Sequence, residues 1–331
     1  MPRIFSGIQP TGIPQLGNYL GAIRNWVHLQ EEFECLFCLV DMHAITVWQD
    51  PAKLKEQTLQ QAAILLAAGI NPDQHILFNQ SAVSAHARLG WIFSCIARIG
   101  WLNRMTQFKD KVGKDREKHS AGLYVYPTLM AADILAYKAT HVPVGDDQKQ
   151  HIELANDIAQ KFNYDYQTEF FPQIKALIPP AAARVMSLRD GTKKMSKSDP
   201  SAQSRIELLD TADDIAQKIR RAKTDSNPLP GTVAALNERP EARNLVEIYA
   251  ALSGVSVDNV LLQFEGNGFG PFKEKLTELV VATIDPIAQK ARSYLKDPDH
   301  IKTILHTGAE KAKAIADPIV EEVEKIVGFI R

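Results

Sequence analysis

The chain has 331 residues, 45% of them hydrophobic, so it is long enough for two domains or for one large core with an extension. A net charge of −1 at pH 7 excludes a generally basic nucleic-acid-binding protein, and any contact with RNA must come from local patches. The longest apolar runs are too short to span a bilayer, and the first residues lack a signal-peptide pattern. We therefore expect a cytoplasmic protein with no membrane segment.

The first half of the chain predicts strands that alternate with helices. Short apolar runs predict strands, and amphipathic patterns predict the helices between them. The expected strands are 3–7, 35–40, 76–78 and 141–144, and the expected helices are 18–32, 51–69, 85–98 and 127–140. This alternation is typical of an α/β fold with a parallel sheet covered on both faces, in which ligands bind at the carboxyl ends of the strands.

The second half of the chain changes character. From about residue 204 onward the pattern is helical throughout. We therefore expect two units: an α/β nucleotide-binding domain over residues 1–203 and an all-helical domain over residues 204–331. The first unit would include a helical insertion at about 104–140, which begins with a polar and basic segment at 104–119.

The cysteines do not predict a metal or redox site. Cys35 and Cys38 form a C-x-x-C, but they lie in an expected strand, where positions three apart point to opposite faces of the sheet. We expect Cys35, Cys38 and Cys95 to be three buried free thiols. No metal-ligand cluster such as H-E-x-x-H occurs, so the sequence predicts no protein-bound metal.

Two segments suit phosphate. The first is a glycine-rich loop between a strand and a helix, Gly7-Ile-Gln-Pro-Thr-Gly12 followed by Gln15-Leu-Gly-Asn18, where free backbone N–H groups meet the positive end of a helix dipole. The second is Lys193-Lys-Met-Ser-Lys-Ser-Asp199, whose lysines are able to follow the charge of a leaving pyrophosphate. Taken singly, a simple turn and a solvated basic loop are open alternatives.

Together the two motifs, about 180 residues apart, resemble the HIGH and KMSKS signatures of class I aminoacyl-tRNA synthetases. Over essentially the whole chain, the sequence is similar to the family of bacterial-type tryptophanyl-tRNA synthetases. This resemblance implies a Rossmann-like catalytic domain. The segments that support it are Phe5–Pro10, Val40–Thr46, Arg104–Lys109, Leu129–Ile134 and Val142–Ile152.

The resemblance implies an ATP site, with Mg²⁺ carried by the ATP. Lys194, Lys197 and Gln9 would be the catalytic residues. Gln15 stands where relatives carry His or Thr, and its amide donates to phosphate but never becomes cationic. The implied ATP-binding residues are Gln9, Pro10, Thr11, Gln15, Gly17, Asn18, Gly145, Asp146, Asp147, Val185, Lys194, Met195, Ser196, Lys197 and Ser198.

An amino-acid pocket is expected around Asp133. Its spacing from Tyr126 and Met130 places the three on one helix face, and an acidic group on an apolar stripe needs a partner. Lys138 or water are open alternatives. The resemblance implies that Asp133 accepts the indole N–H of tryptophan and would be left unpaired by tyrosine or phenylalanine. The implied tryptophan-binding residues are Phe5, Gly7, Val40, His43, Tyr126, Met130, Asp133, Val142, Val144 and Gln148.

For His43, a satisfied buried histidine is an open alternative to a pocket wall. Among the pocket residues, Tyr126 and Gln148 would hold the ammonium group of the amino acid.

The resemblance implies ATP-dependent activation of L-tryptophan, transfer to tRNA(Trp), and a homodimer. Residues 85–107 are the candidate dimer interface, with an ordinary core helix as the alternative. Rival functions are a tyrosyl-specific synthetase, a small nucleotidyltransferase and a non-catalytic RNA-binding relative.

Overall fold

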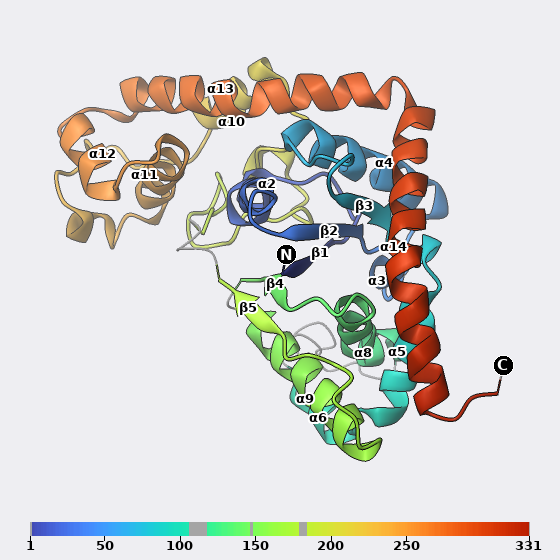
Figure 1. Ribbon diagram of the computed structural model, residues 1–331. Helices are drawn as coiled ribbons and strands as arrows, with labels where there is room; N and C mark the ends of the chain where they lie inside the picture. Colours follow the sequence, from blue (N-terminus) through green and yellow to red (C-terminus); the bar gives the residue numbers. More distant parts are fainter. Residues whose placement is uncertain (1, 106–117, 146–147, 179–183, 331) are drawn as a thin grey trace.

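The computed structural model describes residues 2–105, 118–145, 148–178 and 184–330 (Figure 1). These residues contain a five-stranded parallel sheet in the order β3-β2-β1-β4-β5. The chain builds the sheet outward from β1 in one direction, then crosses to the other side for β4 and β5. This Rossmann-like order places a crevice between β1 and β4. The strands are β1 (Arg3–Ile8), β2 (Glu34–Leu39), β3 (Ile76–Asn79), β4 (His141–Pro143) and β5 (Lys175–Leu177).

Helices cover both faces of the sheet, as the alternating pattern predicts. They begin and end at ordinary signals: Asp50 caps α4, Pro51 is its first residue, and Gly69 ends it. The helices before the fourth strand are α1 (Leu16–Asn18), α2 (Arg24–Leu29), α3 (Asp41–Ala44), α4 (Pro51–Ala68), α5 (Ala85–Ile96), α6 (Ile99–Arg104) and α8 (Ala121–Leu135). The later helices are α9 (Lys149–Asp165), α10 (Ala212–Arg220), α11 (Pro240–Ser253), α12 (Val257–Phe264), α13 (Phe269–Leu295) and α14 (Pro298–Ile326).

Two helices differ from the sequence expectation. The expected helix at 18–32 begins at Leu16, ends at Leu29 and contains a π-helical segment, Tyr19–Ile23. The expected helix at 127–140 runs instead from Ala121 to Leu135. Ser120 caps it by accepting a hydrogen bond from the Leu123 N–H at 3.2 Å, and Pro127 lies inside the helix rather than at its start.

Each face of the sheet has its own core. Side chains alternate along β2, so Cys35 and Phe37 belong to one core and Leu36 and Cys38 to the other. The opposite orientation expected for the C-x-x-C is therefore confirmed. The expectation of three buried thiols is wrong for Cys95, which is exposed on α5. Burial raises the pKa of the Cys35 thiol to about 12, so this group stays protonated.

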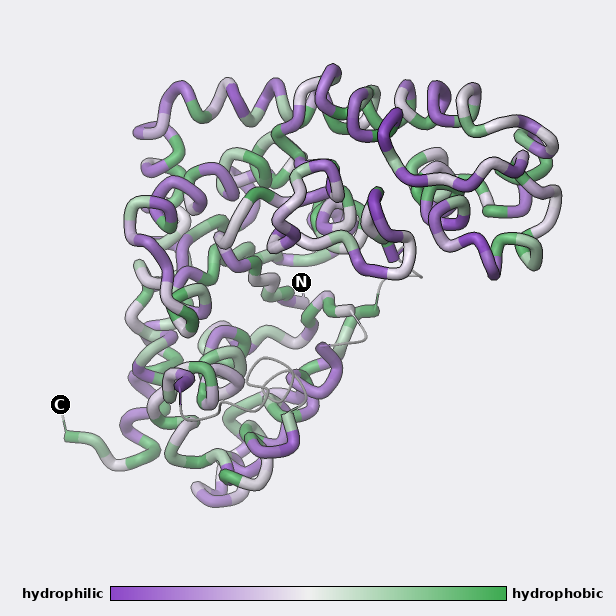
Figure 2. The backbone as a smooth tube through the Cα atoms, turned by 180° about the vertical axis from the view of Figure 1, so that it is seen from behind, coloured by the Kyte–Doolittle hydropathy of each residue, from purple (hydrophilic) through white to green (hydrophobic). Residues whose placement is uncertain are grey.

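The C-terminal region is helical, as expected. In Figure 1, α11 and α12 lie at the end of α13 that is remote from α14, while α10 and α4 pack along α13. The outer helices alternate between hydrophobic and hydrophilic stretches (Figure 2). None of the described helices is by itself long and apolar enough to cross a membrane; α11 and α12 meet that test only as a pair, with a 110° bend between them.

Helix α14 lies against β3, the strand at one edge of the sheet (Figure 1). The approach is closest at Gly308, where an added Cβ atom would overlap the backbone carbonyl oxygen of Leu77. Only glycine lets the helix backbone come this near to the strand. The contact covers an edge that would otherwise present unpaired backbone groups.

We predict that Gly308→Ala lowers the free energy of unfolding by about 1–3 kcal/mol, because the new methyl group forces α14 away from β3. Alanine normally stabilises a helix interior relative to glycine by about 1 kcal/mol, so the steric effect must exceed that gain. Thermal unfolding followed by circular dichroism measures the change. Gly270→Ala in α13 is the matched control, since its Cβ meets nothing within 4 Å. A Gly308→Ala protein as stable as this control would contradict the packing described here.

Candidate active site

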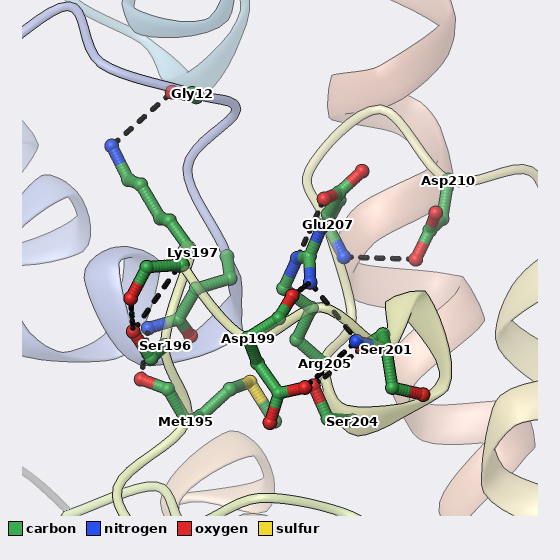
Figure 3. Close-up of polar contacts among 12 residues, drawn as sticks. Gly12, Met195, Ser196, Lys197, Asp199, Ser201, Ser204, Arg205, Glu207 and Asp210 are labelled. Carbon is green, nitrogen blue, oxygen red and sulfur yellow. Dashed lines mark hydrogen bonds and ion pairs between the residues drawn. The ribbon is translucent and has the colours of Figure 1, made fainter.

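The glycine-rich loop and the lysine loop (residues 193–199) meet beyond the carboxyl end of β1. The ammonium of Lys197 donates a hydrogen bond to the carbonyl oxygen of Gly12 at 3.3 Å (Figure 3). The side-chain amide of Gln15 donates to the carbonyl oxygen of Met195 at 3.1 Å. Segments 180 residues apart in the sequence are thus joined by two hydrogen bonds.

The two loops enclose a cleft of about 620 Å³, a size that suits a nucleotide. The cleft is lined by Thr11, Gly12, Gln15, Asn18, Gln49, Gln57, Lys194, Met195, Ser196, Lys197 and Ser198. Eight of the fifteen expected ATP-binding residues are in this set, and Pro10, Gly17 and Gly145 are not. Gln9 is exposed at the end of β1, and the buried Val185 lies behind the lysine loop, where its carbonyl accepts the Met195 N–H at 3.0 Å. Asp146 and Asp147 lie outside the described residues.

Gln15 links loops rather than standing free. Gln15 is buried, and its side-chain oxygen Oε1 accepts a hydrogen bond from the backbone N–H of Gly17. The backbone N–H of Gln15 donates to the side-chain oxygen Oδ1 of Asn18 at 3.0 Å. These bonds form a capping box at the start of α1. Since the amide N–H already donates to Met195, Gln15 connects the helix start to the lysine loop.

The segment after the lysine loop anchors it to the same helix start. The N–H of Leu16 donates to Ile206 and the N–H of Leu208 donates to Pro14, both at 2.8 Å. Arg205 pairs with Glu207 at 2.7 Å and donates to the Asp199 carbonyl at 2.8 Å (Figure 3). The loop is therefore held at both ends.

The two lysines differ in environment. Lys194 is exposed to solvent. Burial of Lys197 lowers its pKa to about 8, because desolvation disfavours the charged ammonium. A phosphate group placed beside Lys197 would compensate this cost.

A second cluster surrounds Asp133, on the face of the sheet that α5 and α8 cover. Asp133 is 1% exposed and accepts three hydrogen bonds. Its Oδ2 accepts from His43 Nε2 at 2.7 Å, and its Oδ1 accepts from Gln80 Nε2 at 2.6 Å and His86 Nδ1 at 2.7 Å. The alternatives of water and Lys138 are wrong, since the Lys138 ammonium lies 3.7 Å from the ring centre of Phe170.

These bonds keep the Asp133 carboxylate ionised. Burial by itself would raise its pKa, but the attraction and hydrogen bonds of His43 and His86 hold the pKa below its usual value. A carboxylate offers about four acceptor positions, and the described residues fill both on Oδ1 and one on Oδ2. One position on Oδ2 remains. The expectation that Asp133 is unpaired without an indole N–H is therefore wrong.

Most of the apolar residues expected in the amino-acid pocket share the core on this face of the sheet. Phe5, Val40, Tyr126, Val142 and Val144 belong to one core cluster, and the partly buried Met130 packs against it. A Cβ atom on Gly7 would lie 3.0 Å from Val40. The expected tryptophan-binding residues therefore come mainly from β1, α3, α8 and β4. Gln148, four residues after Val144 in the sequence, lies at the N-cap of α9.

Tyr126 adds a polar contact to this region. Its hydroxyl is 2.7 Å from His151 Nε2, and its ring packs edge-on against His43 with centroids 6.1 Å apart.

Four residues of this cluster were missed in the sequence: Gln80, His86, Tyr137 and His151. Gln80 directly follows β3, so the rule that places ligands at the carboxyl ends of strands would have indicated it. His151 lies in a segment that carries the family resemblance. His86 and Tyr137 stand in apolar helical sequence and give no signal beyond that of core residues.

The chain is similar to known proteins of one family. The family model described as tRNA synthetases class I (W and Y) matches residues 1–284. The tryptophan–tRNA ligase of Caulobacter vibrioides is 56% identical over 99% of this chain and 96% of its own length. That of Agrobacterium fabrum is 55% identical over 100% and 99%.

Solved structures agree as well. A tryptophanyl-tRNA synthetase from Campylobacter jejuni, complexed with ADP and tryptophan, is 35% identical with a TM-score of 0.83, over 99% of this chain and 100% of its own. The enzyme from Mycoplasma pneumoniae is 32% identical with a TM-score of 0.87, over 100% of this chain and 98% of its own. A match of this extent leaves one conclusion: the chain belongs to the class I tRNA synthetases of the W and Y family.

Proposed function

We propose that the chain is a tryptophan–tRNA ligase, which activates L-tryptophan with ATP and transfers it to tRNA(Trp), releasing AMP and diphosphate. The observation that carries this proposal is the buried Asp133 carboxylate, which three protein donors leave with one acceptor position, together with a two-lysine cleft on the same protein. Tryptophan is the side chain that combines a large apolar body with a single N–H donor.

In the first step the tryptophan carboxylate attacks the α-phosphorus of ATP, and the bond to pyrophosphate breaks. Negative charge moves onto the leaving group, where Lys194 and Lys197 stabilise it. We assign Gln9, which is exposed at the end of β1, to the α-phosphate. In the second step the terminal ribose hydroxyl of the tRNA attacks the adenylate carbonyl, and AMP leaves.

The cleft between the loops suits ATP. The lysines face polyphosphate, and the loop backbone with Asn18 supplies further donors. Gly145, Asp146, Asp147 and Val185 would bind the nucleoside. Mg²⁺ would arrive with ATP and be held mainly by phosphate and water, where it neutralises phosphate charge.

A tyrosyl-specific enzyme is the second candidate, but sequence similarity does not favour it. Relatives more than half identical over nearly the full chain are named tryptophan–tRNA ligases. The tyrosyl-tRNA synthetase from Aeropyrum pernix shares 20% identity and a TM-score of 0.69, which is a likeness of fold.

The remaining parts follow the same proposal. Residues 1–203 form the catalytic unit, and the helices after residue 204 contact the anticodon side of the tRNA. Two chains associate in the cytoplasm through α5 and α6. Trp91 and Ile99 support this surface, because they are 69% and 70% exposed while the opposite side of α5 lies in the core.

We predict that Asp133→Ala lowers tryptophan activation by roughly ten- to hundredfold while ATP still binds. Removing the carboxylate deletes the acceptor for the indole N–H, a charge-assisted bond worth about 1.5–3 kcal/mol. Tryptophan-dependent exchange of labelled pyrophosphate into ATP measures the effect, with tyrosine as the control substrate. An unchanged rate with tryptophan would remove Asp133 from the pocket. Exchange with tyrosine alone would contradict the proposed specificity.

We predict that ATP binding takes up a proton between about pH 8 and 10. Without ATP, Lys197 has a pKa of about 8, and a neighbouring phosphate raises this pKa. Because ATP binds the protonated lysine more tightly, the affinity for ATP falls as the pH rises above 8. Calorimetry in two buffers of different ionisation enthalpy counts the protons. Lys197→Arg should bind ATP without this uptake, because arginine stays charged. Lys194→Arg is the matched control and should keep the uptake. Equal uptake in all three proteins would contradict the assignment.

We predict that Trp91→Glu produces monomers, since a charge at the centre of an apolar contact must be desolvated on association. Sedimentation velocity measures the mass. Trp48→Glu, at a position that is 81% exposed, is the control and should remain dimeric. A dimeric Trp91→Glu protein would place the interface elsewhere.

A further inference from the structure

His86 is completely buried and has one polar partner on each ring nitrogen. Nδ1 lies 2.7 Å from Asp133 Oδ1, and Nε2 lies 2.8 Å from the Tyr137 hydroxyl. An ionised carboxylate only accepts hydrogen bonds, so Nδ1 carries the proton. Nε2 shares a hydrogen bond with the Tyr137 hydroxyl, which is able to donate or to accept. The Asp133 carboxylate thus decides that Nδ1 donates, and the Tyr137 hydroxyl holds the opposite edge of the ring.

The ring of His86 is also fixed by packing. It contacts the rings of Phe5, Phe78 and Tyr137, with centroids 6.4, 5.8 and 5.4 Å away. Phe5 in turn stacks on Tyr137 at 5.8 Å with an angle of 13° between the rings. This aromatic enclosure leaves His86 one orientation, the one that points Nδ1 at Asp133.

His86 and Gln80 occupy Oδ1 together, and this decides which oxygen is open. The side chain of Gln80 is itself held in place, because its oxygen Oε1 accepts the backbone N–H groups of Met42 and His43 at 3.1 and 3.3 Å. With Oδ1 fixed between two donors, the carboxylate does not rotate about its Cβ–Cγ bond. The open acceptor position therefore stays on Oδ2, beside His43.

We propose that His86 is a positioning residue for amino-acid selection: it orients the Asp133 carboxylate so that Oδ2 meets the substrate N–H, and Tyr137 anchors the far side of its ring. This inference rests on the proposed tryptophan specificity. His86 acts through Asp133 and touches no substrate in this scheme. A histidine that only fills the core would stabilise the fold without distinguishing one substrate atom from another.

The test compares two substrates that differ at one atom. In β-(3-benzothienyl)-L-alanine, sulfur replaces the indole N–H of tryptophan. We expect His86→Leu to lower kcat/KM for tryptophan in pyrophosphate exchange at least tenfold, mainly through KM, while the value for the sulfur analogue changes little. His86→Asn keeps an amide N–H near the position of Nδ1 and should restore most of the preference for tryptophan. Tyr137→Phe should lower the preference for tryptophan over the sulfur analogue a few-fold.

A second readout does not depend on turnover. Bound tryptophan labelled with ¹⁵N at the indole nitrogen gives an N–H proton resonance that moves downfield when the bond to the carboxylate is short. We expect this resonance to move upfield in His86→Leu and, by less, in Tyr137→Phe. The control is His75→Leu, which removes another buried histidine, one that binds the Cys35 N–H, and should leave the resonance and the substrate preference unchanged.

The outcomes separate the inference from the function on which it rests. If the unmodified chain exchanges no pyrophosphate with tryptophan, the proposed function fails. If it does, and His86→Leu lowers both substrates equally or leaves the resonance in place, His86 is a core residue and the inference is overturned. Should His86→Leu fail to fold, Tyr137→Phe, which removes one oxygen atom, decides by the same two measurements.

Discussion

A negative charge buried in an apolar region is the constraint around which the pocket is built. The Asp133 carboxylate is shielded from solvent, so its ionisation depends on donors that the fold supplies. Those donors come from three places: His43 in α3, Gln80 after β3 and His86 in α5. Asp133 itself is in α8. The packing of α5 on α8 and the adjacency of β2 and β3 are therefore conditions for the charge as much as for the core.

This arrangement changes how specificity is understood. A carboxylate without partners would reject a wrong substrate by the cost of remaining unpaired. Here the carboxylate is already stabilised by three bonds, and in the proposed function a substrate N–H adds a fourth. Selection then depends on direction: the substrate must bring a donor to one defined oxygen, and a side chain without that donor loses a bond but does not strand a charge.

Sequence reasoning located most of the fold because local signals decide it. The first four strands lie within one residue of their predicted ends, whereas the three-residue β5 was not predicted. The ends of α4 follow from Asp50, Pro51 and Gly69. The π-helical segment at Tyr19–Ile23 has no such signal, and Pro127 inside α8 was misread as a helix start.

The candidate site was predictable only in part. The two loops carry motifs, but the partners of Asp133 stand 47 to 90 residues away from it, and no local pattern links them. His86 reads in the sequence as an ordinary core histidine. Its bond to Asp133 depends on how α5 packs against α8, which only the tertiary structure reveals.

The contact between α14 and β3 has a consequence for how the molecule is made. A ribosome delivers β3 long before α14, so the strand edge stays open while the residues between them are synthesised. During that interval the nascent sheet is able to recruit a strand from another chain, which is the usual route to aggregation. Synthesis of α14 then covers the open edge of β3 and ends the interval in which aggregation is favoured. Chains that end before α14 should depend on chaperones.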